Sequence, residues 1–200
     1  MRALLLPMLL LAAAPAAAEV QLSFYGGWAG APDDGVTLSG NAVTPEIGVP
    51  VEDGSQAGLR ATWWTDGDFG VALDYSRFSL SEGEGAEAGL SFDGLDTLTV
   101  SGLRRWDGVL GTVTPYVGAG VGIGVAEAEV GPSGAPEDVR IEGPAVSWVA
   151  GATVPLGGNW AVFGEYEGTY TDLDGEAEDG RTVDLDGVTN SINLGVSFSF

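Results

Sequence analysis

The sequence predicts an all-β fold, an eight-stranded antiparallel up-and-down β-barrel. Three observations support this prediction. Eight segments of about ten residues alternate apolar and polar positions with a period of two, and none has a helical period. The connections between them are alternately short and long, as in a meander that can close into a barrel. The 33 glycines and the strongly acidic segments suit short strands and polar turns.

The chain begins with a predicted signal peptide, residues 1–18. Arg2 supplies the positive charge, residues 3–14 are almost wholly apolar, and Ala16 to Ala18 give the small-residue pattern of a cleavage site. Residues 19–200 are then expected to form one barrel domain. Prolines within the apolar run argue against a membrane-spanning helix there.

The eight expected strands follow one another along this domain. In chain order they are EVQLSFYGGWAG (19–30), QAGLRATWW (56–64), FGVALDYSRF (69–78), LTVSGLRRW (98–106), VTPYVGAGVGIGV (113–125), AVSWVAGATV (145–154), NWAVFGEYEGTY (159–170) and INLGVSFSF (192–200). Each has one large apolar face, and the other face is small or polar. In the fifth segment the small face is mainly glycine.

Short turns rich in Gly, Asp and Asn are expected at 65–68, 107–110 and 155–159. Long loops are expected at 30–55, 80–94, 127–143 and 171–187, and they hold most of the 29 acidic residues. One end of the barrel is therefore expected to be strongly negative. The sequence DLDG occurs twice in the last loop, and we consider weak binding of divalent cations to these acidic loops.

The composition excludes several functions. A formal net charge of −22 would repel a phosphate backbone, so nucleic-acid binding is not expected. With no histidine and no cysteine, imidazole bases and thiol nucleophiles are absent. Glu165 and Glu167 could form a carboxylate pair, but strand alternation alone produces their spacing. We therefore predict no enzymatic activity, no catalytic residue, no cofactor and no dedicated metal site.

An alternation with a period of two residues does not show which face of each strand points into the barrel. A soluble lipocalin-like carrier would have the apolar face inside, whereas a membrane barrel has it outside. The small, glycine-rich polar face suits a narrow lumen and favours the membrane barrel. Aromatic residues near the strand ends suit two lipid–water interfaces. Those proposed for the interfaces are Trp28, Trp63, Phe69, Trp106, Trp160 and Tyr170.

Charged residues fall on the face predicted to line the lumen. Arg60 and Asp74 flank the first short turn and are expected to pair, because an unpaired buried charge is costly. Glu165 and Glu167 share this parity, and Arg105 is expected to reach one of them or water. We interpret these five residues as a structural ion-pair network. Arg77 has outward parity near the long loops, where its side chain could extend to the lipid–water interface or meet a lipid phosphate.

The signal peptide, the eight alternating strands, PYVGAGVGIGV and the final SFSF resemble the small outer-membrane barrels of Gram-negative bacteria. These are the opacity-protein and OmpA-like transmembrane families, within the porin family in the broad sense. The resemblance implies location in the outer membrane, short periplasmic turns, extracellular long loops, and contact with lipid and lipopolysaccharide. It also implies that the assembly machinery recognises the last strand through Phe198 and Phe200.

The expected function is that of a non-enzymatic, monomeric structural or surface protein with at most a narrow pore. Two alternatives remain open from the sequence. One is a surface adhesin or receptor on the same barrel, and the other is the soluble lipocalin-like carrier of an apolar ligand.

Overall fold

The computed structural model describes residues 19–30, 36–39, 47–49, 51–65, 68–82, 90–108, 110–130, 137–176 and 182–200. All the regular elements of these residues are β-strands. The predicted signal peptide lies outside the described residues.

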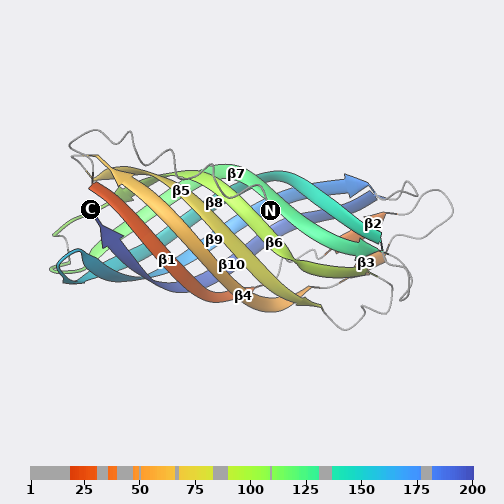
Figure 1. Ribbon diagram of the computed structural model, residues 1–200, viewed down its shortest axis with the longest axis horizontal. Helices are drawn as coiled ribbons and strands as arrows, with labels where there is room; N and C mark the ends of the chain where they lie inside the picture. Colours follow the sequence, from red (N-terminus) through yellow and green to blue (C-terminus); the bar gives the residue numbers. More distant parts are fainter. Residues whose placement is uncertain are drawn as a thin grey trace.

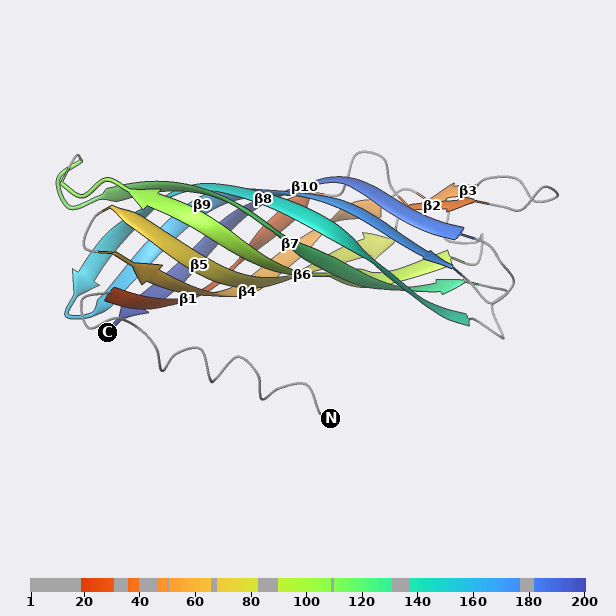
Figure 2. The ribbon, with the colours of Figure 1, turned by 90° about the horizontal axis from the view of Figure 1, so that it is seen from above.

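Eight strands form a closed ring, in agreement with the predicted fold (Figure 1). They are β1 (Glu19–Gly30), β4 (Val51–Trp64), β5 (Phe69–Glu82), β6 (Leu90–Arg105), β7 (Thr114–Val130), β8 (Glu137–Gly157), β9 (Trp160–Glu176) and β10 (Thr182–Ser199). Every neighbouring pair in the ring is antiparallel. The strands wind obliquely around the long axis, as barrel closure requires (Figure 2).

The ring closes where the first strand meets the last. β1 and β10 pair from Gln21 opposite Ser199 to Gly30 opposite Asn190, and the amide of Phe200 donates to the carbonyl oxygen of Val20 at 2.8 Å. Both views place the C-terminus beside the start of β1. The terminal strand therefore has a partner along each edge and leaves no open edge there.

Two further strands lie within the first expected long loop. β2 (Val36–Ser39) pairs with the outer part of β10, and β3 (Ile47–Val49) pairs with β2. This hairpin continues the sheet beyond the point where β1 ends.

The predicted long loops were too long. Most of the described residues in these ranges extend the strands of the ring: β4 begins at Val51, β6 begins at Leu90, β7 continues to Val130 and β9 continues to Glu176. Both DLDG sequences lie in strands, where they pair with each other across β9 and β10. Neither DLDG sequence therefore forms a loop.

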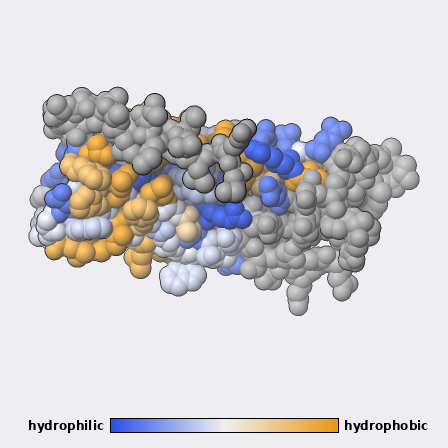
Figure 3. Space-filling model, viewed as in Figure 1, coloured by the Kyte–Doolittle hydropathy of each residue, from blue (hydrophilic) through white to orange (hydrophobic). Residues whose placement is uncertain are grey.

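Over the part of the barrel nearer the short turns, large apolar side chains cover the outer wall. Val121, Ile192 and Leu194 are each about two-thirds exposed, at 66%, 65% and 67%. Hydrophobic residues gather over this part of the surface in Figure 3. The lipocalin-like alternative needs these residues inside and is therefore wrong. An outward apolar face of this kind is what lipid requires.

Farther toward the long loops, polar side chains point outward and apolar side chains point inward. The alternation of side chains along β9 continues there without a break. In β9 the outward positions change from Tyr166 and Tyr170 to Asp172 and Asp174, and the inward positions change from Glu167 to Leu173. Outward acidic residues of the outer half form what we call the acidic collar: Glu127, Glu142, Asp172, Asp174, Glu176, Asp184 and Asp186. Buried apolar residues inside it form the outer plug: Phe78, Leu95, Ile141, Leu173, Val183 and Leu185.

The glycines of β7 are required by the closeness of β6. A Cβ atom added at Gly122 would lie 2.0 Å from the carbonyl oxygen of Leu98, and one at Gly120 would lie 2.1 Å from Oγ of Ser101. On the outward face of β6, a Cβ at Gly102 would have no atom within 4 Å. The small inward face of β7 thus reflects strand packing.

We expect Gly122→Ala to destabilise the barrel by about 1–3 kcal/mol, because the backbone of β6 would have to shift to admit the methyl group. Gly102→Ala is the matched control and should change the free energy of unfolding by no more than about 0.5 kcal/mol. Reversible urea unfolding in lipid vesicles measures both. Equal effects of the two substitutions would contradict this account of β7.

Candidate functional site in the barrel lumen

A cluster of charged side chains crosses the middle of the lumen. Arg60 projects inward from β4 and lies directly opposite Asp74 of β5 in the strand register. Glu165 and Glu167 project inward from β9, on a distant part of the ring. All four residues are buried, with 4–6% of their surface exposed. We call these four the lumen network.

The guanidinium of Arg60 holds the lumen network together. Its Nε donates to Oδ2 of Asp74 at 2.5 Å, and its Nη1 and Nη2 donate to the two carboxylate oxygens of Glu165 at 2.7 and 3.1 Å. Oε2 of Glu167 lies 3.9 Å from Nη2. One cation therefore faces three carboxylates, and it links β4 to β5 beside it and to β9 across the lumen. The fork of the guanidinium suits this bidentate geometry.

Neutral side chains also donate hydrogen bonds to the carboxylates of the lumen network. Tyr25 donates to Asp74 at 2.6 Å and Tyr116 donates to Glu165 at 2.5 Å. Gln56 and Asn193 donate to Glu167 at 3.2 and 3.4 Å. Their roles could not be read from the sequence, because the pairs join strands far apart in the chain.

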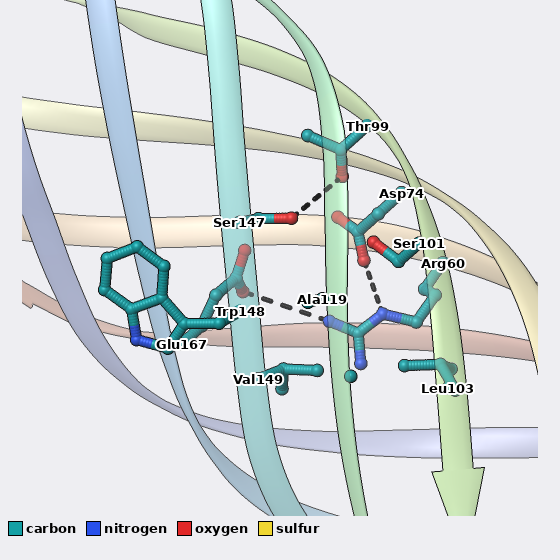
Figure 4. Close-up of a pocket in the computed structure, with 11 residues that line it drawn as sticks. Arg60, Asp74, Thr99, Ser101, Leu103, Ala119, Ser147, Trp148, Val149 and Glu167 are labelled. Carbon is teal, nitrogen blue, oxygen red and sulfur yellow. Dashed lines mark hydrogen bonds and ion pairs between the residues drawn. The ribbon is translucent and has the colours of Figure 1, made fainter.

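Hydroxyl and aromatic side chains fill the lumen on either side of the lumen network. Figure 4 shows Arg60, Asp74 and Glu167 around a small cavity with Thr99, Ser101 and Ser147, while the ring of Trp148 points away from it. This cavity measures about 10 Å³, and a second one toward the short turns measures about 20 Å³. A volume of 10–15 Å³ is roughly what one water molecule needs. An apolar cluster packs next to the network: Tyr25, Trp64, Ala72, Leu103, Tyr116, Val149 and Phe163.

Arg105 lies outside the lumen network and contacts neither Glu165 nor Glu167, which were two of its expected partners. Its Nη2 pairs with Glu19 at 2.9 Å, its Nε lies 3.5 Å from Asp107, and its guanidinium lies 4.4 Å from the ring centroid of Trp64. These contacts place it at the mouth of the barrel near the short turns, where it lines an open vestibule of about 280 Å³. Barrel closure brings Glu19 to that mouth and so gives Arg105 a nearer partner than Glu165 or Glu167.

The aromatic residues proposed for the interfaces lie on the outer wall. Trp28, Phe69, Trp160 and Tyr170 are exposed by 76%, 58%, 52% and 39%, and Trp63 and Trp106 are half-buried. At the closing strand, Phe198 packs edge-on against both Trp160 and Phe200, with ring centroids 4.9 Å apart in each case. Their roles in lipid anchoring and assembly stay predictions.

Arg77 lies on the outer wall as parity predicts, but a carboxylate holds it. Its Nη1 donates to Oδ2 of Asp96 at 3.0 Å, and Tyr75 donates to the other oxygen at 2.7 Å. Both members of the ion pair are partly exposed.

The described residues offer no group of three or more acidic side chains with a geometry suited to a metal ion. None of their elements is a helix long and apolar enough to cross a membrane. Weak cation binding to the acidic loops stays a prediction, because part of each of these loops lies outside the described residues.

A comparison with models of known protein families shows to which family this chain belongs. The model for the outer membrane protein beta-barrel domain matches residues 3–200. The chain belongs to this family. The protein is an outer-membrane barrel, and its outward apolar wall faces lipid. A comparison with curated protein sequences found no match.

Solved structures with the same fold are also outer-membrane proteins. Neisserial surface protein A is 17% identical, with a TM-score of 0.58 over 92% of this chain and 97% of that one. AlkL, solved in lipid bilayers, is 17% identical, with a TM-score of 0.57 over 92% and 90%. OprG from Pseudomonas aeruginosa is 16% identical, with a TM-score of 0.54 over 89% and 95%. At these identities the similarity establishes the fold of this outer-membrane barrel and leaves its specific role open.

We expect Arg60→Met to destabilise the outer-membrane barrel by about 3–5 kcal/mol, because three buried carboxylates would lose their cation. Arg77→Met is the control, since its ion pair with Asp96 is partly exposed and should contribute no more than about 1 kcal/mol. Urea unfolding in vesicles measures both. Similar losses of unfolding free energy in the two variants would show that Arg60 stabilises the barrel no more than an exposed arginine does.

Proposed function

We propose that this protein is a non-enzymatic structural barrel of the outer membrane, with a closed lumen and an acidic extracellular surface. The observation that carries the proposal is the filling of the lumen. From the short turns outward, the lumen holds the apolar cluster around Trp64, the lumen network, a layer of hydroxyl side chains and the outer plug.

A diffusion pore would need a continuous water path, and the packing argues against one. Eight strands leave an interior only wide enough for side chains. The cavities beside Arg60 measure about 10 and 20 Å³, and the six residues of the outer plug are at most 1% exposed. An ion crossing the barrel would have to displace both a charged layer and an apolar layer.

The arrangement of the two glutamates favours a structural role over catalysis. Glu165 is held by Arg60 and Tyr116, and Glu167 accepts from Gln56 and Asn193. Both carboxylates are buried, so neither lies where a substrate could reach it. General acid–base catalysis needs a group within reach of the substrate.

The partners we propose follow from the outer wall. Lipid would cover the apolar zone, and lipopolysaccharide would face the outer part of that zone. We propose that the assembly machinery recognises the last strand through Phe198 and Phe200, and that the barrel is a monomer.

The wild-type barrel should give no conductance steps in planar bilayers, because the lumen is filled. Insertion must be verified separately by the faster gel migration of the unheated, folded form. A sixteen-stranded porin in the same bilayer is the positive control, since barrels of that size enclose an aqueous channel. Regular ohmic steps from the inserted wild-type protein would overturn the closed-barrel proposal.

A surface receptor is the second candidate function, and the register of the acidic collar favours it. Asp172 lies opposite Asp186, and Asp174 lies opposite both Glu142 and Asp184. Like charges in such positions destabilise a sheet. Their presence on neighbouring strands therefore suggests a function that offsets this cost, for which a basic partner is the matching chemistry.

If the acidic collar recognises a basic partner, the barrel in nanodiscs of neutral lipid should bind a lysine-rich peptide, and salt should weaken the binding. The triple variant Asp172→Asn, Asp174→Asn and Asp186→Asn should bind roughly three- to a hundredfold more weakly, if each exposed pair contributes 0.2–1 kcal/mol. Asp107→Asn, at the short-turn end, is the control. Unchanged affinity in the triple variant would rule out recognition by the collar.

A further inference from the structure

Arg104 lies between two aromatic rings on the outer wall at the short-turn end. Its guanidinium carbon is 5.1 Å from the ring centroid of Phe69 on β5 and 5.3 Å from that of Trp106. Both distances are within the range of cation–π attraction. Two rings therefore fix the position of a side chain that would otherwise be free to move over the surface.

Arg104 differs from the other described arginines in its partners. Arg60, Arg77, Arg105 and Arg140 each form an ion pair with a carboxylate. Arg104 has no ion pair among the residues that the structure describes, although its exposed guanidinium belongs to a chain of net charge −22. Its neighbour Arg105 points inward and pairs with both Glu19 and Asp107.

The position of Arg104 along β6 places it at the edge of the lipid-facing zone. The outward residues before it are Leu98, Val100 and Gly102, and all three are exposed. Phe69, Trp160 and Phe200 surround the same end of the barrel with exposed rings. Rings of this kind mark the headgroup level of a bilayer. The guanidinium of Arg104, which has no ion pair among the described residues, is therefore expected at the level of the lipid phosphates.

The wall beside Arg104 also leaves room for a lipid. Gly102 is the next outward residue toward the membrane centre, and a Cβ added there would meet no atom within 4 Å. Its partner on β7 is Ala119, another small residue. An acyl chain could therefore lie close to the wall directly above the guanidinium.

We propose that Arg104, held by Phe69 and Trp106, binds the phosphate group of a phospholipid in the periplasmic leaflet. The planar guanidinium offers paired donors that match two phosphate oxygens, and it carries less tightly bound water than an ammonium group. The low-dielectric side of the interface strengthens the pairing. The site requires only that the barrel lie in the outer membrane with its short turns in the periplasm. It does not depend on the closed lumen or on the acidic collar.

Solid-state NMR tests the contact directly. Protein labelled with ¹³C at arginine Cζ is reconstituted in phosphatidylglycerol bilayers, and dephasing of each Cζ signal by ³¹P is measured. One strongly dephased signal should disappear in Arg104→Gln and persist in Arg77→Gln, whose guanidinium pairs with Asp96. A dephased signal that survives in Arg104→Gln, or no dephasing at all, overturns the proposal.

The source of the phosphate is decided by native mass spectrometry of the detergent-solubilised barrel with added phosphatidylglycerol. The wild type and Arg77→Gln should retain at least severalfold more lipid adduct than Arg104→Gln. Arg104→Lys should retain an intermediate amount, because it keeps the charge but loses the planar fork. Inorganic phosphate should leave the adduct in place. Full displacement by inorganic phosphate would identify a free-anion site and overturn the assignment to lipid.

Discussion

Pairing of β1 with β10 is the constraint on which the rest of the structure depends. In lipid, every backbone amide and carbonyl group must find its partner within the protein, so a sheet can cross the bilayer only as a closed ring. The amide of Phe200 still donates across this seam, to Val20. Closure also fixes the width of the lumen. The inward side chains of eight strands must fill that width without leaving charges unpaired.

The lumen meets this demand with a single guanidinium at its centre. Arg60 contacts Asp74 on the neighbouring strand and Glu165 across the ring, so one side chain joins both halves of the wall. Tyr25 and Tyr116 donate to the same carboxylates and also belong to the apolar cluster beside them. The polar and apolar layers are therefore coupled, and we interpret the charged residues as part of the barrel's packing.

The reversal of polarity along the wall follows from the change of surroundings at the membrane surface. Where lipid covers the outside, apolar residues point out, and the inward residues are polar apart from the apolar cluster beside the lumen network. Beyond the lipid, water covers the outside, so Asp172 and Asp174 point out and Leu173 points in. The outer part of the molecule is consequently built like a water-soluble barrel, with the outer plug as its core. The same strands serve both parts without a change of register.

The sequence by itself determined the ring of eight strands, the parity of their side chains and the pairing of Arg60 with Asp74. These depend on a period of two and on short turns, which are local properties of the chain. It also contained the strand extensions, since VDLDG and TDLDG alternate in the same way. Their Asp and Gly residues made them look like loops, because both residue types are depleted in strands. Only the tertiary structure decided which distant strands meet across the lumen. It placed Arg60 against Glu165 and Arg105 against Glu19. It placed Arg104 between two aromatic rings, with no ion pair among the residues that the structure describes. These pairings depend on the width and stagger of the closed ring, and no local pattern in the chain encodes them.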